Sequence, residues 1–263
     1  MERHYSAKER RTLLLNELKE KGKVTVADLA REFNVTEVSI RKDLEELEGR
    51  KLLIRVKGGA VSPYPDSQHD DMLISEKALL HHREKQRLGA FAASLVQDGE
   101  SIIIDSGTTM MQVANYLDSN LRLTIVTNAL DIAISLYKRT NFQIIALGGR
   151  MRRVSFSTVG MVSETNLKNF YTDKLFLGVD SVSIRDGIST PDIEEASLNQ
   201  AMLDCAHEVI AVFDSSKVNQ RSFAHIAMLD RVDTIVTDNH IPDDLREYIQ
   251  MKGIKLHVVN MDD

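Results

Sequence analysis

The run DSGTT, residues 105–109, directly follows the apolar segment Ile102–Ile104. A glycine lets the backbone approach a ligand closely, and hydroxyl groups beside the free N–H groups of a helix N-terminus suit a phosphate. A second polar run, DSSK at 214–217, follows another apolar segment and ends in Lys217, a positive charge for an anion. Either run alone also fits an ordinary strand-to-helix turn. Together they favour an anion-binding pocket.

Other apolar segments end in residues of similar chemistry. Thr127 and Asn128 end one segment, Gly148 and Gly149 follow the next, and Asp180 comes just after a third. Ligands of parallel sheets bind at the carboxyl ends of the strands. These residues therefore mark the rim of the expected pocket.

Strands and helices that alternate along the chain must position these residues. Seven short runs rich in Ile and Val predict strands at residues 101–105, 123–127, 143–147, 174–179, 209–213, 234–237 and 255–259. Helical segments separate most of them, and a long amphipathic helix is predicted at 76–95. Continuous apolar strands flanked by helices indicate an α/β body with a mainly parallel sheet.

A different pattern, over residues 24–60, precedes this body. Its apolar spacing predicts a helix-turn-helix with the turn at Asn34-Val35, preceded by a helix at 7–21 and followed by a basic hairpin that ends in Gly58-Gly59. The inner faces are expected to be Val26, Leu29, Ala30 and Phe33, and then Val38, Ile40, Leu44 and Leu47. This is a winged helix-turn-helix, which places its second helix in the DNA major groove.

The second helix carries groups that suit DNA. Thr36, Glu37, Ser39, Arg41, Lys42 and Asp43 are predicted to face outward. Hydroxyls at a helix N-terminus can bond phosphate oxygens, Arg41 can reach the paired acceptors of a guanine, and Lys42 suits a phosphate. The alternative is a solvated charged face. The DNA-binding candidates, with the cap residue and the hairpin included, are Thr25, Thr36, Glu37, Ser39, Arg41, Lys42, Arg55 and Lys57.

Charge and prolines divide the chain. Residues 1–60 hold 14 Lys/Arg and 11 Asp/Glu, a balance of +3, and the remaining residues hold 19 and 28, a balance of −9. A basic head on an acidic body fits a DNA-contacting unit joined to a unit that binds something else. The expected domains are a winged helix-turn-helix at 1–61, a linker with Pro63 and Pro65 at 62–75, and an effector and oligomerisation domain at 76–263.

Several classes of protein are disfavoured by what the sequence lacks. No apolar run reaches the ~18 residues of a membrane span, and no apolar segment follows the N-terminal charges, so a cytoplasmic protein without a membrane partner is expected. The single cysteine and the adjacent His81-His82 pair predict no metal site. No G-x-G-x-x-G follows a strand and no G-K-[ST] occurs, so no nucleotide cofactor is expected.

The head resembles the N-terminal domain of DeoR-family bacterial transcriptional regulators. The resemblance lies in VTEVSIRKDL at 35–44, then Leu47-Glu48, Arg55 and Gly58-Gly59-Ala60. Lys51 stands where the family has a glycine after the recognition helix. Either Lys51 adopts a left-handed conformation, at a cost on the order of 1 kcal/mol, or the helix ends at Gly49.

The resemblance continues through the body, in DSGTT at 105–109, FLGVD at 176–180, GIST at 187–190 and DSSK at 214–217. It implies an effector domain similar in fold to ribose-5-phosphate isomerase that binds a phosphorylated sugar. It also implies that 106–109 hold the phosphate with Lys217, and that Asp180, Asp192 and Glu195 meet hydroxyl or amine groups. The effector-binding candidates are Asp105, Ser106, Gly107, Thr108, Thr109, Thr127, Asn128, Gly148, Gly149, Asp180, Asp192, Glu195 and Lys217.

The expected function is therefore a DNA-binding transcriptional regulator, a repressor of a carbohydrate-use operon whose DNA affinity is controlled by a phosphorylated sugar. The runs LFLGVDSVSIRDGIST and DSSKVNQRSF look closest to Aga-type repressors of amino-sugar use. One head reads few bases, so a homo-oligomer, a dimer or larger, is expected on double-stranded operator DNA. The alternatives are a sugar-phosphate isomerase or deaminase with an accessory DNA-binding head, and a nucleic-acid scaffold without an effector.

Overall fold

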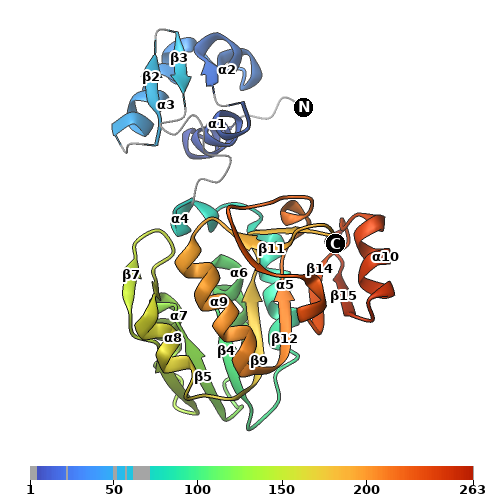
Figure 1. Cartoon of the computed structure of the whole chain (residues 1–263). Helices are drawn as coiled ribbons and strands as arrows, with labels where there is room; N and C mark the ends of the chain where they lie inside the picture. Colours follow the sequence, from blue (N-terminus) through green and yellow to red (C-terminus); the bar gives the residue numbers. More distant parts are fainter. Residues whose placement is uncertain (1–4, 22, 50–51, 57, 62–71, 263) are drawn as a thin grey trace. The chain divides into compact units, whose positions relative to one another are not determined.

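The computed structural model describes residues 5–21, 23–49, 52–56, 58–61 and 72–262 (Figure 1). The chain forms two compact units, Met1–Asp70 and Asp71–Asp263, called here the head and the body. Lys51, Lys57 and residues 62–71 of the expected linker lie outside the described residues. Among the described helices, none combines the length and apolar character needed to cross a membrane.

The head is a winged helix-turn-helix, as predicted. Its elements are α1 (Ala7–Lys21), β1 (Lys23–Thr25), α2 (Val26–Glu32), α3 (Glu37–Gly49), β2 (Ile54–Val56) and β3 (Gly59–Val61). The strands form an antiparallel sheet in the order β1-β3-β2. Its core contains the buried residues Leu14, Leu18, Leu29, Ile40, Leu44, Leu47 and Leu53. Asn34, with φ 50°, makes the predicted turn between α2 and α3.

Two predicted orientations on α3 are wrong. Val38, expected inside, is 59% exposed, and Asp43, expected outside, is only 4% exposed. The buried residues of α3 are Ile40, Asp43, Leu44 and Leu47, spaced i, i+3, i+4 and i+7, which is the core-facing stripe of a helix. Asp43 is tolerated there because Arg10 Nε, at 2.6 Å, and Arg11 Nε, at 3.4 Å, pair with its carboxylate.

The body is built on one sheet in which every predicted strand is present. Within the described residues its order is β15-β14-β12-β9-β4-β5-β6, and every pairing is parallel. The strands are β4 (Ser101–Ile104), β5 (Leu123–Thr127), β6 (Phe142–Ala146), β9 (Thr172–Gly178), β12 (Ala206–Val212), β14 (Thr234–Asp238) and β15 (Lys255–Val259). The expected α/β architecture is confirmed.

Helices cover both faces of this sheet (Figure 1). Ile102 and Ile104 of β4 point to a core shared with α5 (His82–Ala93), α6 (Thr108–Tyr116) and α7 (Leu130–Leu136). Ile103 points to the opposite core, shared with α8 (Met161–Leu167), α9 (Ile193–Cys205) and α10 (Asp243–Met251). Burial on both faces explains why the strands are continuously apolar.

Short antiparallel pieces, which the sequence did not predict, extend beyond the sheet. They are the hairpin of β7 (Arg150–Arg152) and β8 (Ser157–Val159), and the sheet of β10 (Ser181–Ser183), β11 (Gly187–Thr190) and β13 (Ala224–Ala227). Two single-turn helices, η1 (Ser215–Lys217) and η2 (Leu229–Arg231), complete these connections.

The single helix predicted at 76–95 is wrong. The structure instead has α4 (Ile74–Lys77), a turn, and then α5, and α4 begins inside the segment expected as linker. His81 in the turn is left-handed, with φ 49°, and Leu79 is 51% exposed. The carbonyl groups of Lys77 and Leu80 at the break accept hydrogen bonds from the Lys85 ammonium group, at 2.5 and 2.8 Å.

Candidate functional site

Three aspartates meet at the carboxyl edge of the sheet. Strands β12, β9 and β4 are neighbours, and Asp214, Asp180 and Asp105 follow their carboxyl ends. Gly178 allows the close approach, because a Cβ there would lie 3.1 Å from the Ser106 carbonyl oxygen. We name this group, with the charged residues that contact it, the carboxyl-edge cluster.

Asp105 is a buried carboxyl group of the cluster with a raised pKa. It is buried, and its Oδ1 has no hydrogen-bond partner among the described residues. Burial, followed by the negative charge of Glu195, raises the pKa of Asp105 to about 8. Asp105 is therefore largely protonated at neutral pH, and a group that pairs with its free oxygen would relieve a buried unsatisfied atom.

Arg152 enters the cluster from the β7–β8 hairpin. Its Nη1 lies 3.0 Å from Glu195 Oε2, its Nε lies 3.4 Å from Asp192 Oδ2, and its side chain is 6% exposed. Thr190 Oγ1, at the end of β11, lies 2.9 Å from Glu195 Oε2 and 3.1 Å from Asp180 Oδ2. Arg152 thus neutralises the charge of Glu195, and the Thr190 hydroxyl donates a hydrogen bond to it.

Asp180 receives its main positive partner from α4. Lys77 Nζ donates to Asp180 Oδ1 at 2.8 Å. Burial alone would raise the pKa of Asp180, but the charges of Lys77 and Lys217 and the Thr190 hydrogen bond outweigh it and lower that pKa below its ordinary value. Asp180 is therefore an ionised carboxylate held between two lysines.

Lys85 is a buried lysine at the same edge. It is 4% exposed and donates to the two carbonyls at the break between α4 and α5. Burial, and then the charge of Lys217, lower the pKa of Lys85 to about 8, while Asp214 acts in the opposite direction. Lys217 of η1 thus lies close enough to Lys85 and Asp180 to act on both electrostatically.

The DSGTT run forms the entrance to α6. Gly107 is the N-cap residue with φ 114°, and no side chain caps the helix. The first N–H groups of α6 have no partner inside the helix, and the hydroxyls of Thr108 and Thr109 flank them. Ser106 Oγ lies 3.4 Å from Glu195 Oε1, which joins this corner to the carboxyl-edge cluster.

The remaining predicted residues have local structural contacts. Asp192 caps α9, because its carboxylate accepts from the backbone N–H groups of Glu194 and Glu195 at 3.0 and 2.9 Å. Thr127 Oγ1 accepts from the Ala129 N–H at 3.0 Å.

Asn128 Nδ2 donates to the Thr158 carbonyl at 3.4 Å, while its Oδ1 is buried without a partner among the described atoms. Gly148 O accepts from Ser163 Oγ, and a Cβ on Gly149, with φ 146°, would lie 2.3 Å from that same Oγ. The contacts given for these three residues are with Thr158 and Ser163, not with the aspartates of the carboxyl-edge cluster.

Sequence reasoning missed four members of the cluster: Lys77, Lys85, Arg152 and Thr190. Lys85 had a usable signal, because it lies on the stripe of α5 that buries Leu88, Gly89 and Ala92. A lysine on a core-facing stripe indicates a buried charge that needs partners. The other three approach only through tertiary structure.

The exposed side of α3 holds the DNA-binding candidates. Arg41 and Lys42 are exposed, and Arg41 Nη2 pairs with Glu37 Oε2 at 2.7 Å. The Thr36 and Ser39 hydroxyls lie 3.0 Å apart at the helix start. Val38, predicted to face inward, is exposed on the same helix.

The other two described DNA-binding candidates are already bonded within the head. Thr25 caps α2, since its Oγ1 accepts from the Asp28 N–H at 3.1 Å. Arg55 Nη1 lies 3.6 Å from Glu48 Oε2, so the wing strand β2 is tied to the end of α3.

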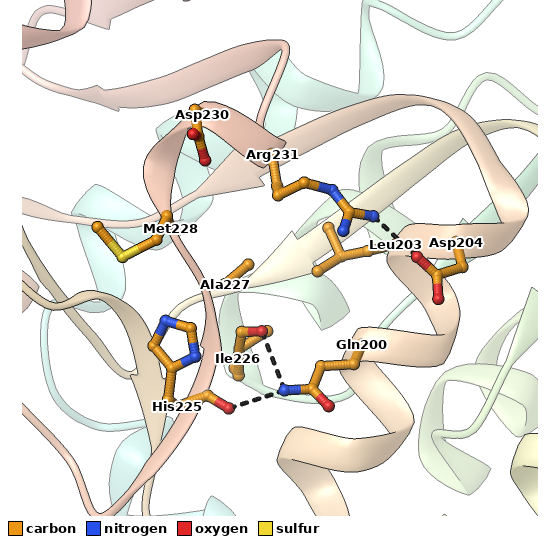
Figure 2. Close-up of a pocket in the computed structure, with 9 residues that line it drawn as sticks. All are labelled: Gln200, Leu203, Asp204, His225, Ile226, Ala227, Met228, Asp230 and Arg231. Carbon is orange, nitrogen blue, oxygen red and sulfur yellow. Dashed lines mark hydrogen bonds and ion pairs between the residues drawn. The ribbon is translucent and has the colours of Figure 1, made fainter.

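A hollow of about 410 Å³ lies elsewhere on the body, between α9, β13 and η2 (Figure 2). Three of its polar side chains are bonded: Gln200 Nε2 donates to the carbonyls of His225 and Ile226 at 3.1 and 3.2 Å, and Arg231 pairs with Asp204 at 2.8 Å. None of the predicted site residues lines this hollow. The hollow and the carboxyl-edge cluster are therefore separate features of the body.

Comparison with known proteins agrees with both units. The model described as the DeoR C terminal sensor domain matches residues 80–239, and that of the DeoR-like helix-turn-helix domain matches residues 10–66. The putative aga operon transcriptional repressor of Escherichia coli O157:H7 is 34% identical over 251 residues, covering 95% of this chain and 93% of that protein. The HTH-type transcriptional repressor GlcR of Bacillus subtilis is 28% identical over 255 residues, covering 97% of each.

Among solved structures, ribose 5-phosphate isomerase A of Methanocaldococcus jannaschii has a TM-score of 0.39 and 16% identity, and the match covers 52% of this chain and 55% of that one. At this score the likeness supports no functional conclusion, and the isomerase alternative gains nothing from it. The two family models and the named relatives agree instead: the chain belongs to the DeoR family and is a DNA-binding transcriptional regulator, not an enzyme.

Proposed function

We propose that this regulator represses a carbohydrate-use operon, with amino-sugar use the foremost candidate, and that a phosphorylated sugar at the carboxyl-edge cluster controls its affinity for operator DNA. The observation that carries the effector site is Asp105, a buried carboxyl group with a free oxygen beside the uncapped N-terminus of α6. The named aga operon repressor among the relatives supports the choice of pathway.

The phosphate is assigned to the corner formed by the start of α6. The N–H groups there and the helix dipole favour an anion, and the hydroxyls of Ser106, Thr108 and Thr109 can donate to its oxygens. Lys217 would supply the positive charge. This assignment gives the DSGTT and DSSK runs one shared ligand.

The sugar is assigned to the carboxylates beyond that corner. Ionised Asp180 and Glu195 accept hydrogen bonds from hydroxyl or ammonium groups, and Asp105 Oδ1 lacks a donor among the described residues. An amine would also gain from the negative charge of Asp180. Asp192 is the weakest candidate, because helix capping and Arg152 engage its oxygens.

The DNA contacts are assigned to α3 and the wing. Arg41 reads a base edge, Lys42 binds a phosphate, and the hydroxyls of Thr36 and Ser39 bind phosphate oxygens at the helix N-terminus. Glu37, Thr25 and Arg55 line or support this face, and Lys57, which lies outside the described residues, is included from the sequence of the wing. The protein acts in the cytoplasm. It acts as a homo-oligomer, because one head reads too few bases to locate an operator.

The effector can release the operator only if it binds the low-affinity state of the protein more tightly. Typical coupling of this kind is about 1–3 kcal/mol, a 5- to 150-fold change in DNA affinity.

A mobility-shift titration tests this function. The full-length protein is bound to DNA from upstream of its own gene and titrated with galactosamine 6-phosphate, glucosamine 6-phosphate, fructose 6-phosphate and ribose 5-phosphate. Unphosphorylated sugars and inorganic phosphate serve as controls. We expect at least one phosphosugar to release the DNA, at a concentration at which the matching free sugar does nothing. Release by none of them contradicts the effector assignment.

A matched pair of variants locates the site. Lys217→Met should bind DNA normally without sugar and lose the response to it, because the charge for the phosphate is gone. Lys168→Met, which changes an exposed lysine at the end of α8, should respond like the wild type. An unchanged response of Lys217→Met removes Lys217 from the site.

A further inference from the structure

The short helix α4 is attached to the carboxyl-edge cluster by two lysines. Lys77, its last residue, donates to Asp180 Oδ1 at 2.8 Å. Lys85 of α5 donates to the carbonyls of Lys77 and Leu80 at 2.5 and 2.8 Å, and its charge interacts with Lys217 and Asp214. The position of α4 thus depends on charges inside the proposed effector site.

Hydrophobic burial contributes little to the position of α4. Among the four described residues of α4, none is buried, and Leu73 and Leu79 on either side of it are exposed. Another anchor is a backbone hydrogen bond from the Ile74 N–H to the Val154 carbonyl, at 2.8 Å, in the hairpin that carries Arg152. An element with little buried apolar surface separates from the domain at a low cost in free energy.

Asp180 is the point at which a ligand and α4 meet. Its Oδ1 is bonded to Lys77, and its Oδ2 lies 3.1 Å from the Thr190 hydroxyl. A sugar hydroxyl or amine that bonds to Asp180 therefore competes with Lys77 and Thr190 for the same carboxylate. A phosphate beside Lys217 would at the same time attract the ammonium group of Lys85, which is the second lysine that holds α4.

We propose that Lys77 is a positioning residue that reports effector binding to the head. The Lys77–Asp180 ion pair holds α4 in place in the effector-free protein, and the phosphorylated sugar displaces Lys77 and releases α4. The inference rests on the proposed effector site. The chain passes from the head into α4, so a change in α4 occurs where the two units are joined covalently. Because coupling is reciprocal, removing the ion pair should favour both effector binding and DNA release.

The first experiment needs no ligand. Hydrogen exchange of the amides at 74–80 is measured in the full-length, effector-free protein. We expect Lys77→Met to raise these rates at least about fivefold, the lower end of typical allosteric coupling, and Lys77→Arg to stay within about twofold of the wild type. Lys168→Met is the matched control. Unchanged exchange at 74–80 in folded Lys77→Met protein overturns the proposal.

The second experiment separates coupling from a merely structural role. Binding of glucosamine 6-phosphate, galactosamine 6-phosphate and ribose 5-phosphate is measured by calorimetry, and DNA affinity by mobility shift. We expect Lys77→Met to bind the active sugar at least about fivefold more tightly, to bind DNA more weakly without sugar, and to change little when sugar is added. A merely structural defect would weaken sugar binding instead, and that result would also overturn the proposal.

The outcomes distinguish this inference from the proposed function. If the wild type binds none of the phosphosugars, the effector assignment fails and the mechanism built on it fails too, whatever the exchange experiment shows. If the wild type and Lys77→Met bind the same sugar equally and release DNA equally, the effector site stands and only the role of Lys77 is refuted.

Discussion

The DNA-binding candidates on α3 of the head and the carboxyl-edge cluster of the body use charged residues in opposite ways. On the head, Arg41 and Glu37 form an ion pair whose side chains are 59% and 51% exposed. On the body, Arg152 and Glu195 form a pair whose side chains are 6% and 11% exposed. An exposed pair contributes roughly 0–1 kcal/mol, because water solvates the charges almost as well when they separate. Loss of one partner of a buried pair leaves a charge that water cannot reach.

The difference fits the ligands that we propose for the two regions. Arg41 can exchange Glu37 for a DNA group at little cost in free energy, because the pair is exposed. The carboxyl-edge cluster is already neutralised by its own residues, so a ligand must match the existing contacts to enter. A new partner can therefore replace Glu37 at Arg41 easily, whereas the carboxyl-edge cluster admits only a ligand that matches its existing contacts.

The largest expected effect comes from breaking the buried pair. Arg152→Met should destabilise the body by about 3–5 kcal/mol, because Glu195 keeps its burial and loses its cation. Urea unfolding followed by far-UV circular dichroism measures this. Arg41→Met is the matched control on the head and should change stability by less than about 1 kcal/mol. Equal changes in the free energy of unfolding for the two variants would contradict the difference between the two regions.

The next effect depends on pH. The pKa of Asp105 is raised by burial to about 8 from an unfolded value of 3.8, so between these pH values the folded protein holds a proton that the unfolded chain releases. The stability from this proton is complete below about pH 4 and lost as pH rises through 8. Asp105→Asn removes this dependence.

The melting temperature of Asp105→Asn relative to the wild type should therefore rise as the pH increases from 5 to 9. Each unit of pKa shift corresponds to about 1.4 kcal/mol. The free energy of unfolding of Asp105→Asn relative to the wild type should therefore increase by more than that amount between pH 5 and pH 9. Asp131→Asn, at a half-buried carboxyl group with a raised pKa outside the cluster, is the comparison variant. A constant difference between Asp105→Asn and wild type across pH would show that Asp105 is ionised in the folded protein.

The same contrast decides how much could be predicted from sequence. The seven sheet strands were predictable because burial on both faces leaves an unbroken apolar run in each. Asp105, Asp180 and Lys217 were predictable as residues at one rim, since parallel strands bring their carboxyl ends together. The β7–β8 hairpin was not, because RMR and STV are too short and too polar to show a period.

The misplaced and overlooked charges share one physical cause. Asp43 and Lys85 are charged residues on the buried stripe of a helix, and their partners lie on other segments: Arg10 and Arg11 for Asp43, and two carbonyls for Lys85. Sequence patterns assign charges to the surface by default, so they miss charges that tertiary partners neutralise. Arg152 and Lys77 were overlooked for the same reason.

On the head, measurements of DNA affinity should distinguish the role of Arg41 from that of Lys42. Arg41→Ala should weaken operator binding by roughly 1–3 kcal/mol and relax preference at one base pair, because a bidentate base contact is lost. Lys42→Ala should weaken binding to all sequences alike and reduce the salt slope by about 1. Mobility shifts on operator variants at several salt concentrations measure both. If Arg41→Ala alters only the salt slope, Arg41 contacts phosphate rather than a base.

The smallest effect on folding comes from Glu37, and there binding and stability should move in opposite senses. Glu37→Gln removes a surface ion pair and should change the free energy of unfolding by less than about 1 kcal/mol. It also frees the Arg41 guanidinium and removes a negative charge that faces the DNA phosphates. Operator affinity should therefore increase, most clearly at low salt, where exposed charges are least screened. Unfolding and mobility shifts on the same preparation make the comparison. Weaker operator binding would show that Glu37 itself accepts a hydrogen bond from a base, as glutamate can from cytosine N4. It would also show that Glu37 holds Arg41 in place for DNA binding and does not compete with the DNA for it.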